Sequence, residues 1–294
     1  MTQRQALLLI NPHSRSGSQD AETLITRLQQ AGLGVTRVTP DGPDHIAAVI
    51  REHQGRVDRV IVGGGDGTIN AALPGIAASE LPMGVLPLGT ANDFARSLGV
   101  PLDPAAACDV IAADHVRRID LGECNGRYFV NVAHIGFAVE VARRSDGDTK
   151  KLMGPLAYPY AAWTAFRTRR RFRVEIRGDD GPWRRLKAIQ VSVGNGRFYG
   201  GGIPIAEDAA IDDGRLDLYA IPAHRDGSLL AMIPALRVGR TRGHDQIETL
   251  AATRIEVRTR QPKTIAVDGE PGGKTPASFR VHPGLLAVYA PPVD

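Results

Sequence analysis

The sequence predicts a two-domain fold, in which an α/β domain is followed by an antiparallel β-sandwich. Up to about residue 120, short apolar runs alternate with segments of helical periodicity, a pattern typical of βαβ units around a parallel sheet. From about Val116 onward, alternating runs are separated by Gly, Asp and Pro turns, which favours an antiparallel sandwich. A chain of 294 residues with 43% hydrophobic composition can bury the cores of two such domains.

The first domain is predicted to comprise residues 1–122, with residues 285–294 returning to it. Its predicted strands are the runs QALLLINP, GVTRVTP, VDRVIVGGG and MGVLPLG. Its predicted helices lie between those strands, at Ser18 to Ala31, Pro43 to His53 and Asp66 to Ala78. This order predicts a parallel sheet with helices on its faces.

The second domain is predicted to span residues 123–284. The strands predicted from Val116 onward are VRRIDLGECNG, RYFVNVAHIGF, RFRVEIRG, LKAIQVSVGNG, RLDLYAIPA, TRIEVRT, KTIAVDGEP, SFRVHP and LLAVYAPP. Two helices are predicted to interrupt these strands, at residues 151–169 and 228–237.

The composition excludes several classes of protein. Cys108 and Cys124 have no CxxC spacing and no accompanying histidine cluster, so neither a disulfide framework nor a structural zinc is expected. The stretch from Leu152 to Phe166 contains a glycine and two prolines and is shorter than the roughly 18 apolar residues of a membrane span. The apolar run near the N-terminus is too short for a secretory signal, so the chain is expected to stay in the cytoplasm.

The charge balance suits an anionic partner. A formal net charge of +4 is compatible with a nucleotide, a phospholipid surface or nucleic acid. No RNP, helix-turn-helix or zinc-finger pattern accompanies the basic residues, so nucleic acid is not an expected partner. No lysine occurs before Lys150, so a phosphate site in the first half has to use arginine, backbone N–H groups or a metal.

A glycine-rich segment, VIVGGGDGTIN, lies where a predicted parallel strand ends and a helix begins. Ligands of open α/β sheets bind at such strand ends, and N–H groups at a helix start favour anions. Three consecutive glycines exceed what a turn requires, because a turn needs positive φ at only one or two positions. The segment matches neither GxxxxGK[ST] nor GxGxxG, so it predicts a phosphate loop of another type, with a ligand-free tight turn as the alternative.

Further motifs follow in a fixed order. NPHSRSG precedes the glycine segment, and LPLGTANDFARSLGVP, VGNGRFYGGG, AIDDGRLDLY and IAVDGEP follow it. Together they resemble the diacylglycerol kinase catalytic-domain family, specifically its bacterial YegS-like lipid kinases, over residues 11–271. GGDGT alone is less specific, because NAD kinases share it. The resemblance implies a three-layer α/β domain like that of NAD kinase and phosphofructokinase, followed by a β-sandwich.

The resemblance also implies an activity, in which ATP and Mg²⁺ are used to phosphorylate a hydroxyl of a lipid such as diacylglycerol. The positions that match the family's ATP contacts are Asn11, Thr39, Gly64, Gly65, Asp66, Gly67, Thr68, Ile69, Asn70 and Thr90. Thr39 and Thr90 close two other predicted strands, so they could converge with the glycine loop on one edge of the sheet. Taken alone, both threonines could equally be turn-forming polar residues.

Phosphoryl transfer needs a metal on the phosphates and a base for the nucleophile's proton, so carboxylates are expected near the cleft. The resemblance implies that Glu270 is the proton acceptor, assisted by Asp212. It also implies a more structural Mg²⁺ ion held by Asp213 and by the main-chain carbonyls of Ala210 and Arg215. Read alone, the DDG and DGE segments are also ordinary hairpin turns. The adjacent like charges of Asp212 and Asp213 would be relieved by a metal or by a raised pKa.

Other polar residues have several interpretations. Asp66 could hold Mg²⁺, cap the helix that follows it, or bind a ribose hydroxyl. Asn92 and Asp93 are placed to cap the next helix, and Arg96 would share a helical face with Asp93. This spacing predicts an ion-pair network behind the nucleotide.

Some positions depart from the family pattern. Ala71 stands where the family often has Glu, and His134 and Ala138 stand where a glycine and a polar residue are common. The segment IAED at residues 205–208 replaces a more usual turn with proline. These departures leave the ATP loop intact, but the level of activity and the acceptor stay open.

A basic segment with aromatic residues, WTAFRTRRRFR at residues 163–173, suits an anionic membrane surface. A solvated helix end that continues into a strand is the alternative. The expected partner is a lipid substrate, reached by peripheral contact at the inner face of the membrane. The oligomeric state is open, with a homodimer among the alternatives.

Two other functions are compatible with the sequence. One is an NAD kinase-like phosphotransferase that acts on a soluble acceptor, and the other is a non-catalytic nucleotide or lipid sensor. The segments AIDDGRLD and VDGEP favour the lipid kinase over the first alternative. Intact carboxylates at Asp212 and Glu270 argue against the second.

Overall fold

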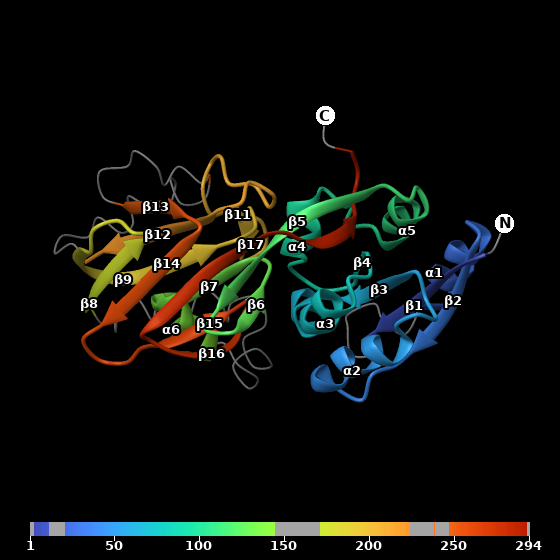
Figure 1. The fold of residues 1–294 in the computed structure, drawn as a ribbon, viewed down its shortest axis with the longest axis horizontal. Helices are drawn as coiled ribbons and strands as arrows, with labels where there is room; N and C mark the ends of the chain where they lie inside the picture. Colours follow the sequence, from blue (N-terminus) through green and yellow to red (C-terminus); the bar gives the residue numbers. More distant parts are fainter. Residues whose placement is uncertain (1–2, 12–20, 145–170, 224–237, 239–246, 293–294) are drawn as a thin grey trace.

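The computed structural model describes residues 3–11, 21–144, 171–223, 238 and 247–292. It confirms the predicted fold class: a helix-covered parallel sheet forms the N-terminal half, and an antiparallel sandwich forms the C-terminal half (Figure 1). Among the described residues, no helix is long and apolar enough to cross a membrane. The predicted helices at 151–169 and 228–237 lie outside the described residues.

Strands and helices alternate in the N-terminal half. The elements are β1 (Arg4–Ile10), α1 (Ala21–Gln30), β2 (Leu33–Val38), α2 (Pro43–His53), β3 (Arg59–Gly64), α3 (Asp66–Ser79), β4 (Met83–Pro87), α4 (Asp93–Leu98) and α5 (Pro104–Ala112). Parallel pairing gives the strand order β2-β1-β3-β4. Helix α2 has the predicted bounds, whereas α5 is not predicted. Its start signal is Asp103, which precedes a proline and whose carboxylate accepts a hydrogen bond from the Ala106 amide at 2.9 Å.

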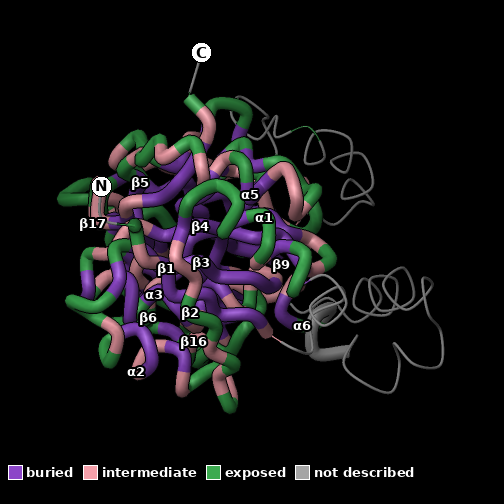
Figure 2. Tube along the Cα trace, turned by 90° about the vertical axis from the view of Figure 1, so that its right-hand side faces the viewer, coloured by how far each residue is buried: buried purple, intermediate pink, exposed green. Residues whose placement is uncertain are grey.

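The central strand of this sheet explains the apolar run in front of the glycine loop. β3 lies between β1 and β4 and is buried along its whole length. Figure 2 shows these strands as buried segments inside the molecule, with exposed residues on the outer surface. Helices α2 and α3 pack closely on one face of the sheet. Glycine at position 75 permits this, since a Cβ atom there would lie only 3.0 Å from Ala47 Cα.

The C-terminal half is built from short antiparallel pairs. The elements are β5 (Val116–Cys124), β6 (Arg127–Phe129), β7 (Val132–Gly136), α6 (Phe137–Arg144), β8 (Phe172–Gly178), β9 (Arg184–Gly194), β10 (Phe198–Tyr199), β11 (Ile203–Pro204), β12 (Leu216–Pro222), β13 (Glu248–Ala252), β14 (Arg254–Thr259), β15 (Thr264–Val267), β16 (Glu270–Lys274) and β17 (Ala277–Tyr289). Its core contains the fully buried rings of Phe129 and Phe279. Cys108 and Cys124 are buried free thiols, one in the core of each half.

One strand is shared by both halves. β17 pairs with β14 at its start, with β5 along its length, and in parallel with β4 where Val288 meets Met83. The runs SFRVHP and LLAVYAPP, predicted as separate strands, are therefore a single strand. The Pro-Gly pair between them forms a bulge rather than a turn, between His282 and Leu286. The Gly284 amide donates to Asp120 Oδ1 at 2.8 Å, which fixes this bulge against β5.

Candidate active site

A cavity of about 1210 Å³ opens at the carboxyl end of the parallel strands, with walls from both halves of the chain. The predicted nucleotide-binding residues on its wall are Asn11, Gly65, Gly67, Thr68, Asn70 and Thr90. From the C-terminal half, Gly126, Arg127, Tyr128 and Glu270 line it. The cavity thus brings the glycine loop and the predicted proton acceptor together.

Strand order explains this convergence. Asn11 follows β1, and its amide donates to the Gly63 carbonyl of β3 at 3.0 Å. The Asn11 side chain continues to the helix start, where Nδ2 donates to Thr68 Oγ1 at 3.2 Å. Thr39 follows the outer strand β2 and is exposed; its neighbour Pro40 lines the cavity and Thr39 does not.

The glycines of the loop serve different purposes. A Cβ atom at Gly64 would lie 2.5 Å from Thr68 Oγ1, so this glycine makes room for the first turn of α3. At Gly65 a Cβ atom would lie 3.2 Å from Gly89 Cα, so this glycine makes room for the loop that follows β4. A Cβ atom at Gly67 would meet nothing within 4 Å, although Gly67 lines the cavity. Of these three glycines, Gly67 is the one that leaves space for a ligand.

Asp66 is the first residue of α3, but its side chain caps α4. The N-cap residue of α3 is Gly65, which makes no side-chain cap bond. The Asp66 carboxylate instead accepts hydrogen bonds from the amides of Asp93 (3.2 Å) and Phe94 (3.0 Å), which are the first amides of α4. Its Oδ1 also accepts from Asn131 Nδ2 at 3.2 Å. Asp66 therefore connects the glycine loop to α4 and to the sandwich.

Asn92 has the expected position at the start of α4, but neither Asn92 nor Asp93 caps this helix with its side chain. Asn92 is the N-cap of α4, but its side chain makes no cap bond; Oδ1 accepts from the Gly89 amide, and Nδ2 donates to the Gly89 carbonyl, both at 3.0 Å. The carboxylate of Asp93 accepts from the amides of Gly201 (3.0 Å) and Gly202 (2.7 Å). Burial raises the pKa of Asp93, and the negative charge of Asp66 adds to this. Arg96, expected to pair with Asp93, donates to the Ala91 carbonyl at 3.1 Å.

Glu270 lies on the opposite wall. It is exposed, and it is the first residue of β16 after the Asp268-Gly269 turn. The next residue, Pro271, is held by β6, where Arg127 Nη1 donates to the Pro271 carbonyl at 2.7 Å, and Arg127 also lines the cavity. A carboxylate at this place can accept a proton from a group bound in the cavity.

Comparisons with known proteins show the family of the chain. The family model "Diacylglycerol kinase catalytic domain" matches residues 5–124, and "YegS C-terminal NAD kinase beta sandwich-like domain" matches residues 131–290. The chain belongs to the YegS-like diacylglycerol kinase family. It is 32% identical over 294 residues to a "Probable lipid kinase YegS-like" of Pseudomonas syringae pv. tomato, a match that covers 99% of this chain and 95% of the relative.

Two further matches have the same extent. A "Probable lipid kinase YegS-like" of Pseudomonas fluorescens is 33% identical, with 99% of this chain and 97% of the relative covered. The crystal structure of a diacylglycerol kinase from Bacillus anthracis superposes with a TM-score of 0.78 at 26% identity, and covers 99% of this chain and 97% of that one. All three relatives therefore match both halves of the chain.

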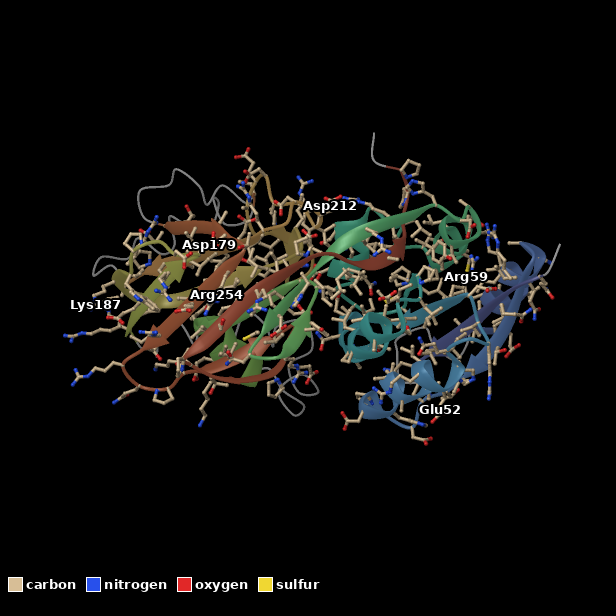
Figure 3. The ribbon with its side chains drawn as sticks, in the orientation of Figure 1. Glu52, Arg59, Asp179, Lys187, Asp212 and Arg254 are labelled. Atoms are coloured by element: carbon tan, nitrogen blue, oxygen red, sulfur yellow. The ribbon has the colours of Figure 1, made fainter. Side chains whose placement is uncertain are left out.

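The second carboxylate implied for a YegS-like kinase, Asp212, is not brought to this cavity. It precedes β12 (Figure 3). Its Oδ2 accepts from Arg117 Nε at 2.9 Å and Nη2 at 2.5 Å. It does not line the cavity that Glu270 lines. Its assisting role thus stays a prediction from the resemblance.

The implied metal position lies in the same turn as Asp212. Burial raises the pKa of Asp213, and the negative charges of Asp217 and Asp120 raise it further. A bound cation would relieve this repulsion. Within the described ranges, no group of three or more His, Cys, Asp and Glu side chains is placed to hold a metal. A cation beside Asp213 would need main-chain carbonyls, and the residues implied for this role, Ala210 and Arg215, flank the turn.

The departures from the YegS-like pattern fall in two places. Ala71 lies on the cavity wall next to Asn70. His134 lies inside the sandwich, where Nδ1 contacts Ser192 Oγ (3.0 Å) and Gln190 Nε2 (3.1 Å). Burial lowers the pKa of His134 to about 4. The amide of Ala138 donates to Gln190 Oε1 at 2.8 Å, so both positions belong to one polar cluster.

Sequence reasoning missed the residues that hold the two halves together at the site. Asn131 is a polar residue inside the apolar run RYFVNVAHIGF, and that interruption is its only signal. Asp268 lies in the DGE segment, which has the sequence of an ordinary hairpin turn, yet it accepts hydrogen bonds from Asn70 and from three backbone amides. These partners are distant in sequence, so no local pattern indicates them.

Proposed function

We propose that this chain is an ATP-dependent lipid kinase, which transfers the γ-phosphate of ATP to a hydroxyl of a lipid such as diacylglycerol. The observation that carries the proposal is the shared cavity, in which the glycine loop and Glu270 face one volume. At about 1210 Å³ this volume exceeds the 300–1,000 Å³ usual for one small ligand. It therefore has room for a nucleotide and for part of an acceptor.

The residues of each wall fit one part of the reaction. Backbone N–H groups at the start of α3 suit the phosphates, because the helix dipole and the free N–H groups both favour anions. The lipid oxygen would form a bond to the γ-phosphorus while the bond to the β-phosphate oxygen breaks and ADP leaves. Glu270 would take the proton of the attacking hydroxyl.

Mg²⁺ bound with ATP would neutralise charge on the β- and γ-phosphates. Asp213, with the carbonyls of Ala210 and Arg215, would hold a separate structural ion. The burial of Asp213 and the negative charges of Asp217 and Asp120, which together raise its pKa, support this assignment.

The acceptor class is tested with purified protein, Mg²⁺ and ATP labelled on the γ-phosphate. The reaction is offered a total lipid extract in detergent micelles, and NAD in a parallel reaction. We expect label in the organic phase and none on NAD. Label on NAD would favour a soluble acceptor, and ATP binding without label on either acceptor would favour a sensor.

We propose further that the enzyme reaches its lipid by peripheral contact with an anionic membrane. Supporting this, cations outnumber carboxylates on the outward face of β8, β9, β14 and the first half of β17. The cations are Arg173, Arg177, Arg185, Lys187, Arg254, Arg258 and Arg280, and the carboxylates are Glu175 and Glu256. Cross-strand register places them on one face. Two of the guanidinium groups stack on the Trp183 ring, with Cζ of Arg177 4.8 Å and Cζ of Arg258 4.2 Å from the ring centroid.

Vesicle sedimentation tests this contact. We expect binding to vesicles that contain phosphatidylglycerol and little binding to phosphatidylcholine alone, since each cation contributes about 1 kcal/mol near an anionic surface. Replacing Arg173 and Lys187 by Glu should release the protein, whereas Arg56→Glu, an exposed change on the α/β half, should not. Equal binding of all three proteins would contradict the proposal.

A further inference from the structure

The turn in front of Glu270 has a specific backbone shape. Asp268 and Gly269 connect β15 to β16, and both have positive φ, 47° and 86°. Positive φ at both central residues is the geometry of a type I′ turn, and Asp-Gly is a favoured pair for it. Val267 pairs with Glu270 across the turn. The direction in which Glu270 leaves the turn therefore depends on the conformation of these two residues.

The carboxylate of Asp268 is bound outside the hairpin. It accepts hydrogen bonds from three successive amides between β6 and β7, those of Val130 (2.9 Å), Asn131 (3.1 Å) and Val132 (2.8 Å). The Asp268 amide donates back to the Val132 carbonyl at 2.9 Å. A type I′ turn forms without side-chain hydrogen bonds to another segment. The shape of the turn therefore does not explain why the Asp268 carboxylate makes these bonds.

A fourth bond connects the turn to the nucleotide half. Asn70 Nδ2, on α3 and on the cavity wall, donates to Asp268 Oδ2 at 3.0 Å. The adjacent Asn131 side chain donates to Asp66, which begins the same helix. The hairpin of Glu270 is thereby tied to the first turn of the helix that follows the glycine loop.

Burial and hydrogen bonding act in opposite directions on Asp268. Burial is the largest influence and raises the pKa of Asp268, the four donors lower it, and the balance is a pKa of about 6. The ionised carboxylate is the form that can accept all four hydrogen bonds. Glu270 is exposed by comparison, so its place at the cavity depends on the backbone that carries it.

We propose that Asp268 is a positioning residue for the phosphoryl transfer, which fixes the turn that carries Glu270 and holds it in register with the nucleotide loop. This inference rests on the proposed function, because it assigns Glu270 as the proton acceptor. Asp268 itself takes no proton from the substrate and acts through Glu270.

A double-mutant cycle tests the proposal. In Asp268→Asn, an NH₂ group replaces one carboxylate oxygen. This group is a donor, so it cannot accept the hydrogen bonds that the oxygen accepts from backbone amides. We expect kcat to fall by about 10²-fold, since small misplacements of a catalytic group have effects of this size, while the KM for ATP stays unchanged. In the Glu270→Gln background the same change should cost little further activity, because the group it positions is already inactive. Equal losses in both backgrounds would overturn the proposal and leave Asp268 with a structural role.

A matched control comes from a second turn. Asp179 also has positive φ, 46°, and its carboxylate accepts from the Arg254 amide and from Thr253 Oγ1, at a place remote from the cavity. Asp179→Asn should keep the kcat of the wild type. If the Asp268→Asn variant does not fold, Gly269→Ala is the second variant that tests the proposal. A Cβ atom there meets nothing within 4 Å, so this change strains only the turn. A Gly269→Ala enzyme with wild-type kcat would equally overturn the proposal.

The two proposals fail in distinguishable ways. If the wild type transfers no phosphate to lipid, the proposed function fails. If the wild type is active and Asp268→Asn matches it, only the positioning role fails.

Discussion

The two walls of the cavity are held in place in different ways. On the nucleotide side, backbone packs directly on backbone: a Cβ atom at Gly89 would lie 2.4 Å from Gly65 Cα, and the Asn92 side chain makes two hydrogen bonds to the Gly89 backbone. On the sandwich side, Glu270 stands on an exposed hairpin whose turn is anchored by the carboxylate of Asp268. Substitutions at the tightly packed positions of the nucleotide wall are therefore expected to act through stability, and substitutions on the sandwich wall through catalysis.

Gly64→Ala should have the largest effect on stability. The new methyl group would lie 2.5 Å from Thr68 Oγ1 and 2.6 Å from Thr68 Cβ, in the first turn of α3. Overpacking of this kind costs about 1–3 kcal/mol. Urea unfolding would measure the loss. An unchanged unfolding midpoint would show that the nucleotide wall is more tolerant than its contacts imply.

His134 should make the sandwich sensitive to acid. Its pKa of about 4 lies below the ordinary 6.5, so the folded chain binds fewer protons than the unfolded chain between these pH values. The stability that neutral His134 contributes is complete above pH 6.5 and is lost as the pH falls towards 4. The slope is at most about 1.4 kcal/mol per pH unit.

Comparison with His134→Gln isolates this contribution. Stability measured by urea unfolding at pH 7, 6 and 5 should fall more steeply for the wild type than for the variant. Parallel pH profiles would show that His134 does not titrate between folded and unfolded states.

Gly67→Ala should have the smallest effect on stability and act on the ligand. Since a Cβ atom meets nothing within 4 Å, and alanine favours a helix, stability should stay equal or rise by up to about 1 kcal/mol. The methyl group would occupy space in the cavity, so ATP binding should weaken by about tenfold, the equivalent of a modest overpacking cost. Titration calorimetry with ATP would measure this affinity. An unchanged affinity would show that the phosphates do not bind next to Gly67.

Much of the α/β half could be predicted because its signals are local. The apolar run of β3, the glycines after it and the helix from Pro43 to His53 each follow from neighbouring residues. The meeting of Asn11, the glycine loop and Thr90 follows from strand order alone.

The connections across the site could not be predicted. Asp66 bonds to residues 27 and 28 positions away, and Asp268 to Asn70 across 198 positions. Asp212 and Glu270 both lie in acidic turns, yet one binds Arg117 and the other lines the cavity. Which turn faces the nucleotide is decided by the packing of the two halves and not by the turn sequence.

The central claim is that Glu270 takes the proton of the acceptor hydroxyl as this hydroxyl attacks the γ-phosphate of an ATP held by the glycine loop. The most direct test compares label transfer from ATP to lipid by the wild type and by Glu270→Gln, with ATP affinity measured in parallel. Exposed Glu52→Gln, away from the cavity wall, serves as the control (Figure 3). We predict that kcat of Glu270→Gln falls by about 10²- to 10⁴-fold with ATP affinity and unfolding midpoint unchanged. Full activity in Glu270→Gln would contradict the account.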